Sequence, residues 1–138
     1  MSNFNAFLKP VYFEKTKEFV LSDRFLDEEG KPAKMTIRSI TQEKNNDLVK
    51  LSTKRETRKG IEIEELDRHE FQARLITTCV VEPDFSGEEI CKTYGVVDPL
   101  QVPTKMLFPG EYARLLREIM ANNGFKDDTE VGEEAKNS

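Results

Sequence analysis

The sequence has little of what catalysis, secretion or membrane insertion usually needs. Its 138 residues include no tryptophan, one histidine and two cysteines. Cys79 and Cys91 are too few for a disulfide framework and do not form a close pair of the zinc-binding type. No apolar run is long enough to span a bilayer, and the first residues lack the basic-then-apolar order of a secretory signal. We therefore expect a cytoplasmic protein that does not associate with membranes.

Catalytic motifs are also missing. His69 has no second histidine at metal-ligand spacing, and no serine lies in a nucleophile-elbow context. The glycines are scattered rather than gathered in a phosphate-binding loop, and the carboxylates lie in stretches that would leave them solvated. The sequence predicts no catalytic residues, no cofactor and no metal, and hence a protein that is not an enzyme.

The net charge of −5 is concentrated at the end of the chain. Residues 126–138 hold five acidic residues against two lysines, which gives −3, and only one aliphatic side chain. Such a segment buries too little apolar surface to offset the entropy of ordering it. The sequence therefore predicts a single domain over residues 1–125 and a disordered acidic tail over 126–138.

One basic cluster stands against this acidic background, in "KLSTKRETRKG" at residues 50–60. It contains no aromatic side chain that could stack on bases. Cations in the last turn of a helix, opposite the negative end of the helix dipole, explain the cluster more simply than phosphate contacts do. A nucleic-acid partner is therefore not expected.

Apolar periodicity predicts an α+β fold with an N-terminal β-hairpin followed by four to five helices. Alternating apolar residues flank the turn sequence "DEEGKP" within residues 16–40, which indicates the hairpin. A helix is expected from the N-cap Thr41 to Gly60, and a central core helix over residues 65–83. Shorter helices should end near Gly95 and follow Asp98, before a last helix over residues 110–122.

The last helix raises the question of what Glu111 does. It follows Pro109 and Gly110, so it lies in the first turn, where a carboxylate stabilises free amide groups without any catalytic role. The helix also carries an apolar stripe, part of which could face outward as a binding surface. The predicted partner-binding residues are Phe108, Tyr112, Leu116, Met120 and Phe125.

The order of several segments resembles the XkdN-like tail assembly chaperones of tailed phages and prophages. The segments are "FLK", "SDRFLDEEGKPAKMTIRSI", "EFQARLITTCVVEPDF", "ICKTYGVVDP" and "KMLFPGEYARLLREIMANNGF", spread over residues 7–125. The resemblance implies a non-catalytic cytoplasmic protein that keeps the tape-measure protein soluble during tail assembly and is absent from the finished virion. It also implies tail-tube subunits as a second candidate partner. A homo-oligomer is compatible with it.

Two alternatives stay open. The chain could be a minor structural component of the tail, or a nucleic-acid-binding regulator that uses residues 50–59. In addition, the tripeptide Ala135–Asn137 is compatible with a slippery codon run, as in tail chaperones that have a frameshift-extended form.

Overall fold

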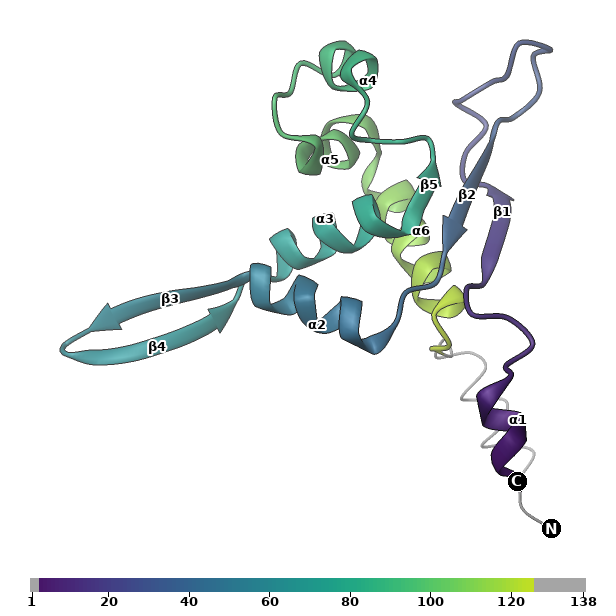
Figure 1. Cartoon of the computed structure of the whole chain (residues 1–138). Coiled ribbons are helices and arrows are strands. Elements are labelled where there is room, and N and C mark those ends of the chain that lie inside the picture. Colours follow the sequence, from purple (N-terminus) through teal and green to yellow (C-terminus); the bar gives the residue numbers. More distant parts are fainter. Residues whose placement is uncertain (1–2, 126–138) are drawn as a thin grey trace, which may run out of the picture.

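A computed structural model describes residues 3–125 of the chain (Figure 1). The first half contains α1 (Phe4–Leu8), β1 (Thr16–Val20), β2 (Lys34–Arg38), α2 (Gln42–Leu51), β3 (Thr53–Arg58) and β4 (Ile61–Leu66). The second half contains α3 (Arg68–Cys79), β5 (Val80–Glu82), α4 (Glu88–Thr93), the 3₁₀ helix η1 (Pro99–Gln101), α5 (Val102–Met106) and α6 (Pro109–Asn122). The predicted acidic tail and the Ala135–Asn137 tripeptide lie outside the described residues.

The predicted N-terminal hairpin is confirmed. Strands β1 and β2 pair in antiparallel fashion, and β5 adds to the other edge of β2. Met35 and Ile37 alternate on β2 and are both buried, so one face of this small sheet contributes to the core. In the turn, the Asp27 carboxylate accepts hydrogen bonds from the backbone N–H groups of Glu29 and Lys31, and Gly30 adopts a φ of +82°.

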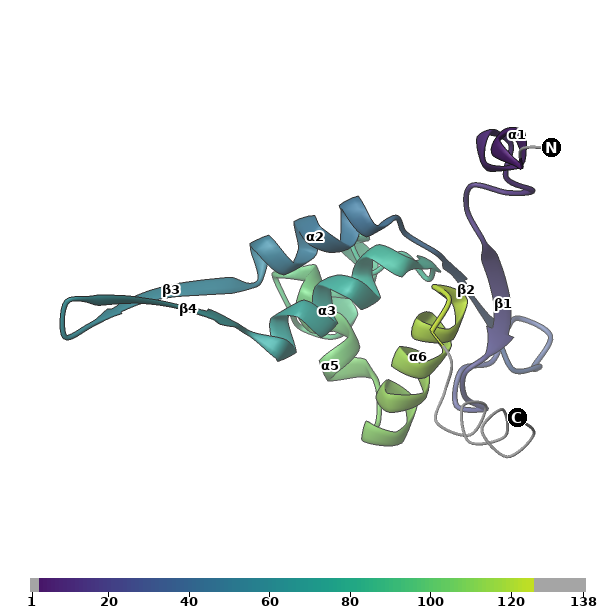
Figure 2. The ribbon, with the colours of Figure 1, turned by 90° about the horizontal axis from the view of Figure 1, so that it is seen from below.

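Helix α3 lies at the centre of the molecule, and α2, η1 and α6 pack around it (Figure 2). Asp67 caps its N-terminus by accepting a hydrogen bond from the Glu70 N–H. Helix α6 also contacts β2, which joins the helices to the sheet. The most deeply buried side chains come from the sheet, from α3, α5 and α6 and from the loop after β5, and they include Ile37, Ile76, Cys79, Phe85, Val102, Leu115 and Ile119. The α+β class is therefore confirmed, with five α-helices between the hairpin and residue 125.

The helix expected from Thr41 to Gly60 is wrong in its second half. Thr41 does cap α2, but the helix ends at Leu51 and is followed by a second hairpin, β3–β4. The Ser52 and Thr53 hydroxyls donate to the carbonyls of Leu48 and Val49, which satisfies the last turn of the helix with side chains. Gly60 therefore does not end a helix, and the basic cluster lies mainly on a strand rather than in a helical last turn.

The central helix is also shorter than the predicted range of 65–83. Leu66 pairs with Thr53 in the second hairpin, so α3 begins only after Asp67. At the other end the chain becomes extended at Val80, because Val80 and Glu82 pair with β2. Pairing with a neighbouring strand has thus replaced the last helical turn that the apolar pattern favoured.

Candidate functional site

Helix α6 begins as the sequence predicts. The Glu111 carboxylate accepts a hydrogen bond of 2.7 Å from the Phe108 N–H, which satisfies one of the free amide groups of the first turn. Along the helix, Leu115, Ile119 and Asn122 are buried and form the side that faces the core. The interpretation of Glu111 as a capping residue is confirmed.

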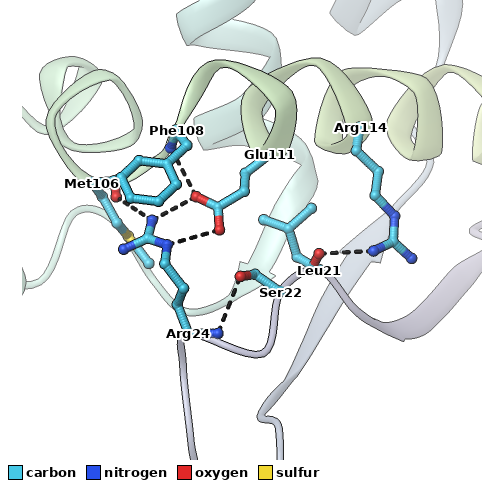
Figure 3. A network of polar contacts seen from close by, with 7 residues as sticks. All are labelled: Leu21, Ser22, Arg24, Met106, Phe108, Glu111 and Arg114. Carbon is cyan, nitrogen blue, oxygen red and sulfur yellow. Dashed lines mark hydrogen bonds and ion pairs between the residues drawn. The ribbon is translucent and has the colours of Figure 1, made fainter.

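Glu111 has a second partner that lies far away in the sequence (Figure 3). The Arg24 guanidinium donates from Nε to Glu111 Oε2 at 2.9 Å, and from Nη2 to Glu111 Oε1 and to the Met106 carbonyl. Its hydrogen bonds lower the pKa of Glu111 from 4.5 to about 2, with smaller contributions in the same direction from Ser22 and from the Phe108 N–H. The loop after β1 is thereby fixed to the start of α6.

The same guanidinium covers one of the predicted binding residues. Arg24 Cζ lies 3.8 Å from the centre of the Phe108 ring and 4.8 Å from that of Phe25. Phe108 is still 58% exposed, so it contributes to a surface that combines an aromatic ring with a cation. The sequence predicts an apolar surface here, and the structure adds a cation to it.

Tyr112 and Leu116 lie between core and surface. Both are half-buried and pack against the core cluster, and burial raises the pKa of the Tyr112 hydroxyl. Two contacts hold this helix against the first hairpin: Arg114 Nη1 donates to the Leu21 carbonyl at 2.7 Å, and Lys17 Nζ lies 2.7 Å from Glu118 Oε2. Because Tyr112 and Leu116 pack against the core cluster, these two predicted binding residues also help to hold α6 on the domain.

Met120 and Phe125 line a pocket of about 360 Å³ where α2, α3 and the end of α6 meet. The pocket floor is apolar and includes Phe71 and Leu75 from α3. Asn123 belongs to the polar part of the lining, and its Oδ1 accepts a hydrogen bond of 2.8 Å from the Ile40 N–H. The remaining lining residues are Ile40, Thr41, Gln42 and Asn45. Phe108, at the other end of α6, does not line this pocket.

Phe71 and Leu75 lie on the helix that the sequence predicts as the central core helix, and the sequence predicts no pocket there. Phe71 and Leu75 lie one turn apart on α3, whereas Met120 and Phe125 come from the end of α6 and the residues after it. No spacing within either helix identifies the pocket, because Leu116, one turn before Met120, does not line it. The pocket depends on how the helices pack together, which the sequence does not show.

No group of three or more histidine, cysteine or acidic residues within residues 3–125 could hold a metal ion. In the same part of the chain, no helix combines the length and the apolar character that a membrane crossing requires. The pocket is lined by apolar and amide side chains together with Thr41, and the charged cluster around Arg24 lies at the other end of α6.

Comparison with known proteins assigns the family. The family model of the phage XkdN-like tail assembly chaperone proteins matches residues 4–136. The chain belongs to this family.

Relatives and a solved structure agree with the assignment. The chain is similar to the uncharacterized protein YqbN of Bacillus subtilis strain 168, with 37% identity over 120 residues, 86% of this chain and 80% of that protein. It is also similar to the phage-like element PBSX protein XkdN of the same strain, with 35% identity over 85% of this chain and 81% of that protein. The crystal structure of YqbN matches with a TM-score of 0.73 and 30% identity, covering 88% of this chain and 96% of that one. The resemblance stated from the sequence is confirmed.

Proposed function

We propose that this family member acts in the host cytoplasm by binding, without catalysis, and that it holds apolar helical segments of the tape-measure protein during tail assembly. The observation that carries the proposal is the pocket lined by Phe71, Leu75, Met120 and Phe125. Its volume of about 360 Å³ is near the lower end of the roughly 300–1,000 Å³ typical of ligand pockets. That is room for one or two large side chains of a partner helix.

The exposure of the pocket side chains supports a protein partner. Phe125 is 59% exposed and Met120 37% exposed, so apolar surface lies open at the edge of a packed domain. Methionine and aromatic side chains can adapt to different apolar partners, which suits a chaperone whose client has a long and varied sequence. The amides of Asn45 and Gln42 at the rim can hydrogen-bond polar groups between the client's apolar positions.

The test is co-expression with the tape-measure protein, followed by purification and measurement of how much client stays soluble. The wild-type chain should give a soluble complex, and Phe125→Glu should reduce the recovered client at least tenfold because it places a charge at the pocket edge. Val97→Glu is the matched control, since Val97 is 99% exposed and lies outside the pocket. A client that is lost equally with both variants, or with neither, contradicts the assignment of the pocket.

Parallel measurements distinguish the other candidate roles. A tail-tube subunit that co-purifies in place of the tape-measure protein would make the tube the client. Detection of this chain in purified particles by mass spectrometry would favour the minor structural component. A nucleic-acid role has less support, because Lys54 lies 3.2 Å from Glu70 Oε2, and Arg55 lies 2.9 Å from Glu64 Oε1.

A further inference from the structure

The N-terminal arm, defined here as residues 4–13, leaves large apolar side chains in solvent. Helix α1 buries none of its residues and stands apart from the rest of the molecule in both ribbon views (Figures 1 and 2). Phe7 is 81% exposed, Val11 97% and Phe13 86%, and Leu8 and Tyr12 are each 59% exposed. A contiguous apolar surface of this kind usually marks a site that another molecule covers.

The arm leaves the domain beside the pocket. Beside it, the Lys15 N–H donates to Ser39 Oγ at 2.8 Å and the Lys15 carbonyl accepts from the Ser39 N–H at 2.8 Å, while Glu14 lies 3.7 Å from Arg38 Nη1. The same carbonyl accepts from Asn122 Nδ2 at 2.9 Å. Ser39 and Asn122 directly precede Ile40 and Asn123, which line the pocket. An apolar pocket and an exposed apolar arm thus lie next to each other.

We propose that two copies of this chain exchange their arms, so that each arm places its apolar side chains in and around the pocket of the other copy. The exchange is reciprocal and therefore closes as a two-fold dimer without leaving a free binding surface of the same kind. The proposal concerns self-association in the absence of a client. It uses the pocket that the proposed function assigns to the client, so the client would displace the arm.

The apolar area that the arm exposes favours a second copy of the chain as the molecule that covers it. An aromatic side chain buries about 150–250 Å². With the exposed fractions of Phe7, Leu8, Val11, Tyr12 and Phe13, the arm offers roughly 700 Å² of apolar side-chain surface. A specific dimer interface buries roughly 800 Å² on each partner. Two exchanged arms together with the surfaces they cover reach that size, whereas a single pocket accommodates only part of one arm.

Docking of the arm in its own pocket is disfavoured by the course of the chain. On the N-terminal side of Lys15 the chain runs away from the domain, and a return of the arm to its own pocket would require a reversal of the chain within residues 9–15. Pro10 fixes its own φ and narrows the backbone conformations open to Lys9, which limits how sharply the chain can turn back at these two residues.

The first test is the mass of the purified full chain, without client, measured by sedimentation equilibrium from about 5 to 500 µM. The wild-type chain should be a dimer, and the triple variant Phe7→Ser/Val11→Ser/Phe13→Ser should dissociate at least tenfold more readily while its circular dichroism stays unchanged. Leu26→Ser/Val97→Ser is the matched control, because both side chains are exposed and lie outside the arm and the pocket. A wild-type chain that is monomeric throughout, or a dimer that the arm variant leaves intact, overturns the proposal.

The second test identifies where the arm lies. A Val11→Cys chain mixed with a Gln42→Cys chain should give a disulfide-linked heterodimer on mild oxidation, because Gln42 lies at the pocket rim and Cys79 and Cys91 are buried. A chain with both substitutions that cross-links internally and stays monomeric would place the arm in its own pocket and overturn the exchange. Co-purification of the client with the triple arm variant is measured separately. Loss of the client together with a monomeric wild-type chain would assign the arm to the client instead.

Discussion

Replacing Glu111 by glutamine removes one charge from the cluster around Arg24 and leaves its shape nearly unchanged. The Arg24 side chain is 34% exposed and that of Glu111 13% exposed, so the pair is partly shielded from water. The lowering of the Glu111 pKa from 4.5 to about 2 corresponds to about 3 kcal/mol at full strength, since one pKa unit equals about 1.4 kcal/mol. Solvent screening on the Arg24 side reduces this, and we expect Glu111→Gln to lower the free energy of unfolding at pH 7 by about 1–2 kcal/mol.

The pH dependence of this loss distinguishes the charge from the cap. The folded-state pKa of Glu111 lies below the unfolded-state value, so its stabilisation is complete above about pH 5 and is lost as pH falls toward 2. Urea unfolding at several pH values should therefore show a difference between wild type and Glu111→Gln that shrinks by roughly half at pH 3. Glu64→Gln is the control, because its carboxylate is paired but 54% exposed and should change stability by less than about 0.5 kcal/mol. An equal loss at pH 7 and pH 3 would refute the charge argument.

Two further predictions concern the core. Ile119→Ala should lower the free energy of unfolding by about 2–5 kcal/mol because Ile119 is fully buried. Met120 is 37% exposed, so Met120→Ala should lower the free energy of unfolding by about 1 kcal/mol or less. Thermal unfolding of both variants measures the difference, and similar losses would contradict the assignment of Ile119 to the buried face and of Met120 to the exposed face. Burial raises the pKa of the Cys79 thiol, and Cys91 is also buried. A thiol reagent at pH 8 should therefore label neither cysteine in the native protein and both after denaturation. Rapid labelling of the native protein would contradict the structure.

The features that could be predicted from the sequence are those that depend on neighbours in the chain. The alternation of Met35 and Ile37 and the turn at Asp27–Lys31 are local, and the first hairpin forms as expected. The capping role of Glu111 depends on residues three positions apart and is also confirmed. Its pairing with Arg24 joins positions 87 residues apart, and no local pattern indicates that contact.

The second hairpin was missed for a different physical reason. Strand β4 does alternate, with Ile61 and Ile63 between glutamates, but β3 ("TKRETR") has no apolar residue and therefore carries no strand pattern that could pair with it. What defines the hairpin instead is the turn, where Lys59 and Gly60 have φ of +53° and +78°, as a two-residue hairpin turn requires. Lysine is an uncommon residue at positive φ, which explains why the sequence "RKGI" gave no turn signal. The good helix formers before it favoured the wrong element.

The sequence identified the apolar stripe on α6 but not which of its residues are buried and which are exposed. A spacing of four residues identifies a helix face, but it does not show how far that face turns from the core. Leu115 and Ile119 are fully buried, while Met120 and Phe125 reach the pocket. The difference depends on where α2 and α3 end relative to α6, which is a property of the packed structure and not of the α6 sequence.

The two projecting segments of the molecule differ in how their exposed surfaces are protected, and this difference bears on the arm. The β3–β4 hairpin has free edges and exposes Ile61 and Ile63, but these lie opposite Arg58 and Glu56. Cross-strand charge pairs such as Arg55 with Glu64 oppose pairing with another sheet. The arm has no comparable protection: between Phe7 and Phe13 the one charged side chain is that of Lys9. A chain that protects one projection with charge and leaves the other apolar is adapted to having the second covered. The dimer measurement on the arm variant therefore bears more directly on assembly than any change in the hairpin.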